Sequence, residues 1–96
     1  MRLISRSTLR DYWENHRDAE VPLKSWIKVV KGSEWQKPAD IKAAFSSASF
    51  VGDRVVFNIG GNNYRLVVAV AFDVDIVYVK FVGTHAEYDK INVAEV

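Results

Sequence analysis

The sequence predicts an α+β fold, in which an N-terminal helical hairpin packs on an antiparallel sheet and a short helix follows. Two observations predict it. Apolar residues in the first half recur at the spacing of one helix face, and after residue 49 the apolar period changes to two. Glycine, asparagine and aspartate then separate the apolar runs, as hairpin turns do. Helices that cover one face of an antiparallel sheet make an α+β layer arrangement.

Size and composition narrow the class of protein. The chain has 96 residues, 49% hydrophobic and 26% charged, which is the balance of a globular protein, and we expect one domain over residues 1–96. It has no cysteine, which excludes disulfides and zinc–thiolate sites. With only two histidines and no ligand spacing around them, we expect no metal and no cofactor. No apolar run is long enough for a signal peptide or a membrane span, so we expect the cytoplasm.

Three helical segments are predicted. The first covers Ser7–His16, with Ser7 as the N-cap because its hydroxyl can accept from an orphan backbone N–H. The second covers Leu23–Val30, and the short polar connection between the two predicts that they fold back as a hairpin. A weaker helical turn follows over Pro38–Phe45.

The second half predicts a three-stranded meander. Arg54–Ile59 and Tyr64–Phe72 flank a turn of two glycines and two asparagines, and Ile76–Val82 forms the third strand. The middle strand is apolar on both faces, which indicates a central position covered on both sides. Leu3–Ile4 can add a strand at one edge, and Ala86–Ile91 predicts the C-terminal helix.

One cluster of side chains could carry chemistry. His85 and Tyr88 lie three apart just after the third strand and so share a helix face. Arg65 begins the neighbouring antiparallel strand and can approach the same end of the sheet. A guanidinium can hold a phosphate, an imidazole can move a proton near neutral pH, and a phenol can stack on a base. Together they suffice for metal-free RNA cleavage, in which the ribose 2′-OH attacks its own phosphate.

A purely structural interpretation fits the same residues. His85 can cap a helix, Tyr88 can be half-buried packing, and Arg65 can form an ordinary ion pair with Asp89. Spacing alone leaves both interpretations open.

Two longer motifs resemble a known family. Val56–Val67 reads VFNIGGNNYRLV, and Phe81–Ile91 reads FVGTHAEYDKI. These motifs and their separation resemble HigB-type toxins of bacterial toxin–antitoxin pairs, members of the RelE superfamily. The opening residues and Lys37–Ser46 are similar as well, so the resemblance covers nearly the whole chain and is strongest over residues 37–91.

The resemblance implies a RelE-like fold and an mRNA interferase that enters the ribosomal A site and cuts translated message without a metal ion. Arg65 matches the family's strand arginine, and we expect it to stabilise charge on the phosphate. His85 and Tyr88 match the TH-EYD motif. We expect His85 to transfer a proton and Tyr88 to stack on a base or transfer a proton.

The resemblance also implies partners. We expect Lys37, Lys42, Lys80 and Asn62 to contact RNA. Many toxins of the superfamily are strongly basic, whereas this chain has a net charge of +1, so its lysines would have to form a local patch. The expected inhibitor is a HigA-like helix-turn-helix antitoxin, through which alone the toxin would be linked to DNA.

Two other functions fit the same sequence. One is a non-catalytic interaction or co-repressor module that keeps the toxin fold. The other is a free-standing ribonuclease, which is harder to support because free RNA would have to be positioned by few acid–base groups.

Overall fold

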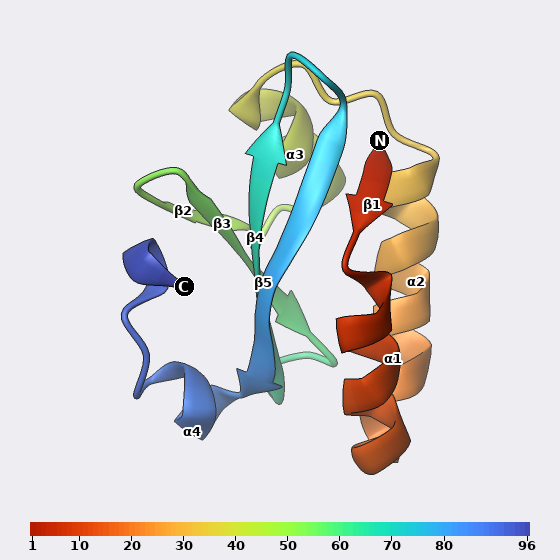
Figure 1. Ribbon diagram of the computed structural model, residues 1–96, viewed down its shortest axis with the longest axis vertical. Helices are drawn as coiled ribbons and strands as arrows, with labels where there is room; N and C mark the ends of the chain where they lie inside the picture. Colours follow the sequence, from red (N-terminus) through yellow and green to blue (C-terminus); the bar gives the residue numbers. More distant parts are fainter.

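A single five-stranded sheet forms the centre of the molecule, with the strand order β1-β5-β4-β3-β2 (Figure 1). In this computed structural model of residues 1–96, β1 pairs in parallel with β5 and the other neighbours are antiparallel. In chain order the elements are β1 (Arg2–Ile4), α1 (Arg6–Asn15), the 3₁₀ turn η1 (Arg17–Ala19), α2 (Glu20–Lys31), α3 (Pro38–Ala44), β2 (Ser49–Val51), β3 (Arg54–Ile59), β4 (Tyr64–Ala71), β5 (Ile76–Thr84), α4 (His85–Tyr88) and the 3₁₀ turn η2 (Val93–Glu95).

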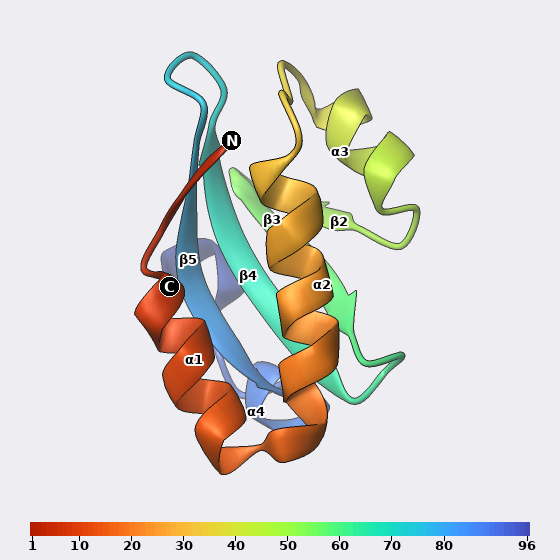
Figure 2. The ribbon, with the colours of Figure 1, turned by 90° about the vertical axis from the view of Figure 1, so that its right-hand side faces the viewer.

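One face of the sheet is covered by the helical hairpin. Helices α1 and α2 lie side by side over it, joined by η1 (Figure 2). Their apolar stripes enter a core of buried residues, in which the Trp26 ring meets Phe57 edge-on at 5.4 Å between ring centres. Trp13 and Trp35 are also buried in this core. The predicted packing of the tryptophan-bearing helix faces on the sheet is therefore confirmed.

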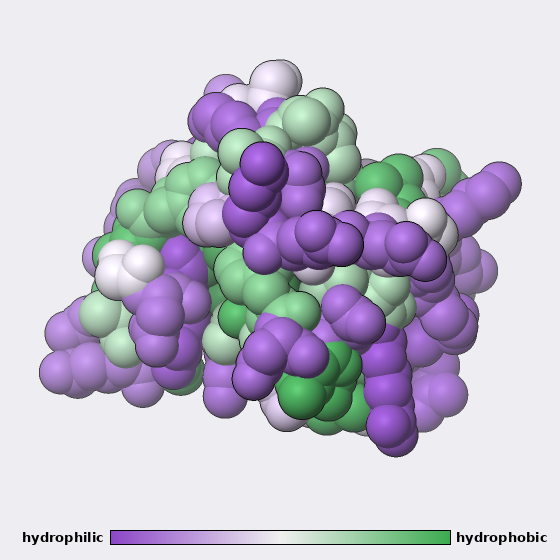
Figure 3. Space-filling model, turned by 90° about the horizontal axis from the view of Figure 1, so that it is seen from above, coloured by the Kyte–Doolittle hydropathy of each residue, from purple (hydrophilic) through white to green (hydrophobic).

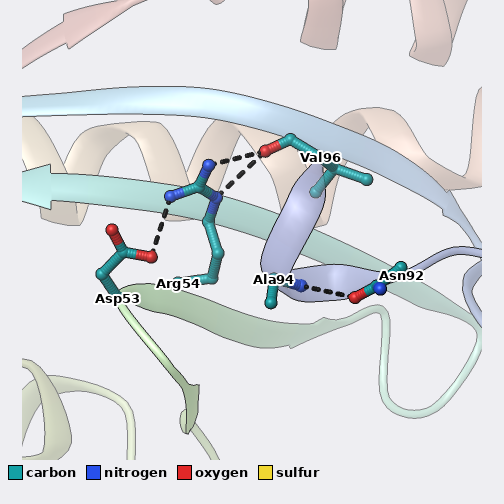
Figure 4. A network of polar contacts seen from close by, with 5 residues as sticks. All are labelled: Asp53, Arg54, Asn92, Ala94 and Val96. Carbon is teal, nitrogen blue, oxygen red and sulfur yellow. Dashed lines mark hydrogen bonds and ion pairs between the residues drawn. The ribbon is translucent and has the colours of Figure 1, made fainter.

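The opposite face is covered as well. Val56 and Val67 pair across β3 and β4 and are almost fully buried, although neither belongs to the core under the helices. The C-terminal segment lies on this side of the sheet (Figures 1 and 2). Arg54 holds it there, because its Nε and Nη2 donate to the Val96 backbone oxygen at 3.0 and 2.8 Å (Figure 4). The prediction that β4 is covered on both faces is thus confirmed.

The predicted fold class is confirmed, and the differences are local. The N-cap prediction for Ser7 is wrong: α1 begins at Arg6, and its N-cap is Ser5, whose backbone is left-handed (φ 70°) and whose side chain caps nothing. The chain leaves β1 through that left-handed residue, so Ser7 falls inside the first turn. Strand β5 continues to Thr84 rather than ending at Val82, and the last helix covers His85–Tyr88 rather than Ala86–Ile91.

Strand β2 was not predicted. Its three residues follow a run of small side chains typical of a loop, and they pair with β3 through a turn at Gly52, where φ is +60°. The predicted edge strand near Leu3 is present, and it pairs with β5 in parallel, so the sheet is mixed rather than purely antiparallel. None of the helices has the length and apolar character that a bilayer crossing requires.

Candidate active site

Arg65 lies at the end of the sheet where β3 and β4 join. It pairs with Gly83 of β5, and its Nη1 donates to the backbone oxygens of Asn62 at 3.2 Å and Tyr64 at 3.1 Å. These bonds hold the half-buried guanidinium beside the turn. No carboxylate lies within ion-pair distance of it, so its charge is available to an anion.

His85 reaches the same end of the sheet from β5. Its backbone N–H donates to the Asn63 oxygen at 3.2 Å, which fixes the start of α4 against the β3–β4 turn. Its Nδ1 lies 3.1 Å from Oδ2 of Asp89, and the side chain is 54% exposed. A carboxylate on Nδ1 orients the ring and leaves Nε2 free for another partner. The structural alternative of an Arg65–Asp89 ion pair is wrong, because Asp89 pairs with His85.

Tyr88 closes α4, three residues after His85. Its side chain is half-buried, and its hydroxyl makes no hydrogen bond within the chain. The backbone thus brings Arg65, His85 and Tyr88 to one end of the sheet from two segments. No hydrogen bond or ion pair joins the three side chains to one another.

A short helix supports this arrangement. Thr84 and Glu87 form the capping box that their spacing predicts: the Thr84 N–H donates to Glu87 Oε1 at 2.7 Å, and the Glu87 N–H donates to Thr84 Oγ1 at 3.1 Å. Both bonds close the turn that bears His85. They also account for the lowered pKa of Glu87, whose largest cause is the backbone N–H of Thr84.

The helix-facing side of the same sheet end holds a network that the sequence did not predict. We call it the aromatic cluster: Tyr12, His16 and Tyr64 with the carboxylates of Asp18 and Glu87. The rings of Tyr12 and His16 stack at 4.0 Å, and Tyr64 meets Tyr12 edge-on at 5.8 Å. The Tyr12 hydroxyl donates to Glu87 Oε1 at 3.3 Å, and the Tyr64 hydroxyl donates to Asp18.

The electrostatics agree with these contacts. Burial, followed by the Glu87 charge, raises the pKa of Tyr12 well above its ordinary value. The hydrogen bond to Asp18 is the largest cause of the raised pKa of Tyr64. Both phenols therefore stay protonated as donors over the neutral range. The Tyr12–Glu87 contact spans 75 residues of the chain, and the Tyr64–Asp18 contact spans 46. No local sequence pattern can therefore signal either contact.

The four residues expected to contact RNA lie in three parts of the fold: Asn62 in the β3–β4 turn, Lys80 in β5, and Lys37 and Lys42 at α3. The oxygen of Asn62 accepts from Arg65, so Asn62 belongs to the candidate site. Lys80 is the unpaired residue of a bulge in β5, since Phe81 pairs with Val67 and Val79 with Val68. Its exposed ammonium lies 5.8 Å from the Tyr78 ring centre.

Lys37 and Lys42 lie elsewhere. Both belong to α3 or its N-cap, at the end of the sheet opposite α4 and the β3–β4 turn (Figures 1 and 2). Lys42 donates to the Ala48 oxygen at 2.7 Å. Seen from the α3 end, the surface alternates hydrophilic and hydrophobic side chains (Figure 3). Lys37 and Lys42 therefore lie apart from the end of the sheet that carries Arg65 and His85.

Other cations gather on α1. Arg6, Ser7, Arg10 and Trp13 line a shallow hollow of about 240 Å³, and Lys24 lies 5.3 Å from the centre of the Trp13 ring. Neither arginine has a carboxylate within ion-pair distance. No three histidine, aspartate or glutamate side chains gather closely enough to hold a metal ion.

Comparisons with known proteins place the chain among toxins. Residues 19–91 match the HigB toxin family, described as the RelE-like toxic component of a toxin–antitoxin system. The chain is 33% identical over 92 residues to the mRNA interferase toxin HigB of Escherichia coli K12, an alignment that covers 93% of this chain and 88% of the relative. The same values hold for the mRNA interferase HigB of Shigella flexneri. The mRNA interferase HigB of E. coli O6:H1 is 28% identical, over 95% of this chain and 91% of the relative.

Proposed function

This chain belongs to the HigB family of RelE-like toxins, and we propose that it is an mRNA interferase, an endoribonuclease that cuts message on the translating ribosome. The observation that carries the proposal is the placement of Arg65, His85 and Tyr88 at one end of the sheet, with the Arg65 guanidinium free of carboxylates. The names of the HigB relatives support the same activity.

The proposed reaction needs only groups that the chain supplies. The ribose 2′-OH attacks the adjacent phosphorus, the bond from phosphorus to the 5′ oxygen breaks, and the products are a 2′,3′-cyclic phosphate and a 5′-OH. One group removes the proton of the 2′-OH and another protonates the leaving 5′ oxygen. No electron transfer occurs, and no metal ion is required for the atoms and charges to balance.

Each side chain has a distinct proposed role. Arg65 stabilises the negative charge that grows on the phosphate, and it can do so because its remaining N–H groups have no acidic partner. His85 transfers a proton through the Nε2 that Asp89 leaves free. Tyr88 stacks on a base or transfers a proton through a hydroxyl that makes no bond within the chain.

Dependence on the ribosome fits the sparse site. A net charge of +1 and a divided set of lysines provide weak general attraction for RNA. A message held by the ribosome arrives already oriented, which can replace much of the binding that the toxin lacks. We propose that the toxin enters the A site, and that it acts in the cytoplasm, where translation takes place.

The proposed inhibitor is a HigA-like helix-turn-helix antitoxin that binds DNA on behalf of the pair. The family description implies an antitoxin as partner, since it names a toxic component of a two-part system. The toxin itself contacts no DNA in this proposal.

The test is induction of the chain alone, with mapping of the 5′ ends of cellular mRNA. Growth arrest with new ends inside translated frames is expected, and the variant R65A should abolish both. Purified protein should cut message on programmed ribosomes and leave the same naked RNA intact. Unimpaired growth with intact message would favour a non-catalytic co-repressor, and cutting of naked RNA would indicate a free-standing ribonuclease.

A further inference from the structure

The aromatic cluster lies directly behind the candidate active site. Tyr64 pairs with Thr84, on the rung of the β4–β5 ladder next to the Arg65–Gly83 pair. Because alternate residues of a strand face opposite sides of the sheet, Tyr64 points toward the helices and Arg65 away from them. Tyr64 is buried, whereas Arg65 is half-buried.

Glu87 connects the two sides. One oxygen, Oε1, accepts from the Thr84 N–H at 2.7 Å and from the Tyr12 hydroxyl at 3.3 Å. The first bond closes the turn of α4, and the second ties that turn to the end of α1. His85 lies two residues before Glu87 in α4, and Tyr88 follows it directly. The two bonds to Glu87 therefore also hold the backbone that carries His85 and Tyr88.

Tyr12 is itself held firmly. Its ring stacks on His16 at an interplanar angle of 6°, and Nδ1 of His16 lies 3.2 Å from the Tyr12 backbone oxygen. Tyr64 meets both rings edge-on, and its hydroxyl bonds to Asp18 just beyond α1. The end of the helical hairpin is thus joined to β4 and to α4 by two separate phenol–carboxylate bonds.

We propose that Tyr12 and Glu87 are positioning residues of the nuclease, which hold the α4 turn so that His85 and Tyr88 stand at a fixed place relative to Arg65. The Tyr64–Asp18 bond serves the β4 side of the same site. This inference rests on the proposed function for its catalytic consequence. It differs from a general stabilising role, because α4 has only four residues and none of them is buried.

Two variants separate the bond from the fold. Tyr12→Phe removes one hydroxyl and keeps the ring stack, and Glu87→Ala removes the shared acceptor. Glu87→Gln keeps an acceptor oxygen for both donors. Tyr78→Phe is the matched control, since it removes a tyrosine hydroxyl of the same sheet that makes no hydrogen bond.

On programmed ribosomes, Y12F and E87A should lower kcat by roughly fivefold to a hundredfold with little change in KM, because a displacement of about 1 Å at reacting groups can cost about 10²-fold. E87Q should recover most of the rate, and Y78F should match the wild type. The double variant Y12F/E87A should be no slower than E87A alone, because both substitutions break the same link.

Amide hydrogen exchange gives a readout that does not depend on activity. The amides of residues 85–89 should exchange faster in Y12F and E87A than in the wild type, with exchange in the sheet unchanged. Wild-type kcat or unchanged exchange at α4 in Y12F would each overturn the proposal. A wild-type protein that cuts no message would refute the nuclease function. The exchange rates alone would then decide whether the Tyr12–Glu87 hydrogen bond holds the α4 turn.

Discussion

Arg65 and Gly83 face each other across the β4–β5 ladder, and Gly83 precedes His85 by two residues in the chain. Cross-strand partners present their side chains on the same face, so a side chain at position 83 would stand on the face that carries the Arg65 side chain. The Phe81 ring and Glu87 already fill that place: a Cβ on Gly83 would lie 2.6 Å from Phe81 Cζ and 3.2 Å from Glu87 Cβ. The sheet end that bears the candidate site is therefore closely packed around one glycine.

Gly83→Ala should disturb this packing. The added methyl group must displace the Phe81 ring or the α4 turn, and overpacking of this kind costs roughly 1–3 kcal/mol of unfolding free energy. Urea denaturation of G83A should show that loss. The double variant Gly83→Ala with Phe81→Leu should recover part of that loss. Gly61→Ala cannot serve as a control, because the φ of +68° at Gly61 would strain the backbone of any residue with a side chain. Equal stability of G83A and wild type would contradict the close contact.

Arg65→Ala should lower the rate of ribosome-dependent cleavage by about 10²-fold or more, as loss of a group that stabilises transition-state charge does. Arg65→Lys should remain strongly impaired, because an ammonium lacks the planar fork of a guanidinium. Cleavage of a defined message, followed by primer extension, measures both. The melting temperature should change little, since Arg65 bonds only to its own turn. A rate within a fewfold of wild type would remove Arg65 from the mechanism.

His85→Ala should lower the same rate by at least about tenfold, in keeping with the loss of a proton-transfer group. Asp89→Asn should have a smaller effect in the same direction, because the amide still contacts Nδ1 but stabilises a protonated ring less well. Single-turnover cleavage is the measurement, and Lys90→Ala, which alters the next residue along, is the control. A loss below tenfold in H85A would place the proton transfer elsewhere.

Acid should loosen the α4 turn. The pKa of Glu87 is lowered in the folded chain, so its bonds contribute stability that is complete above the ordinary value of 4.5 and lost as pH falls through the lower folded pKa. Amide exchange at residues 85–89, corrected for its intrinsic pH dependence, should therefore rise as pH falls below about 4.5. E87Q should remove this dependence. A wild-type turn whose protection stays constant through the acid titration of Glu87 would be inconsistent with the capping bonds.

Alkali should reveal the two bonded phenols. The pKa values of Tyr12 and Tyr64 are raised above 10, so their hydrogen bonds contribute fully below pH 10 and are lost as pH rises through the folded values. Absorbance of phenolate in the wild type should include a late-titrating portion that decreases in Y12F and again in Y12F/Y64F. If the absorbance lost in Y12F came instead from the portion that titrates near pH 10, the pKa of Tyr12 would not be raised, against its burial beside Glu87.

The fold was predictable where its causes are local. The apolar periods gave α1, α2 and the meander, and the glycines of the β3–β4 turn supply the positive φ that the tight hairpin needs. Thr84 and Glu87 stand three apart, so their capping box could be inferred directly. By contrast, β2 has only three residues, too few to show a period of two.

The site was predictable only in part, because its contacts differ in range. Antiparallel pairing of β4 with β5 follows from the meander, and it carries Arg65 to the start of α4. The direction of a long side chain does not follow from pairing, and Arg65 bonds to backbone oxygens where an ion pair with Asp89 was one expectation. The Tyr12–Glu87 contact joins opposite ends of the chain and depends on how the hairpin sits on the sheet. No sequence pattern encodes that placement.

All three tryptophans lie between the helices and the sheet, and each is at most 7% exposed. Their emission will shift to the red when the helical layer separates from the strands, which makes intrinsic fluorescence a direct optical signal for that separation. The region around Arg65 and His85 has no indole of its own. Fluorescence will consequently miss rearrangements there, and a protein with native tryptophan emission can still be disordered at the candidate active site.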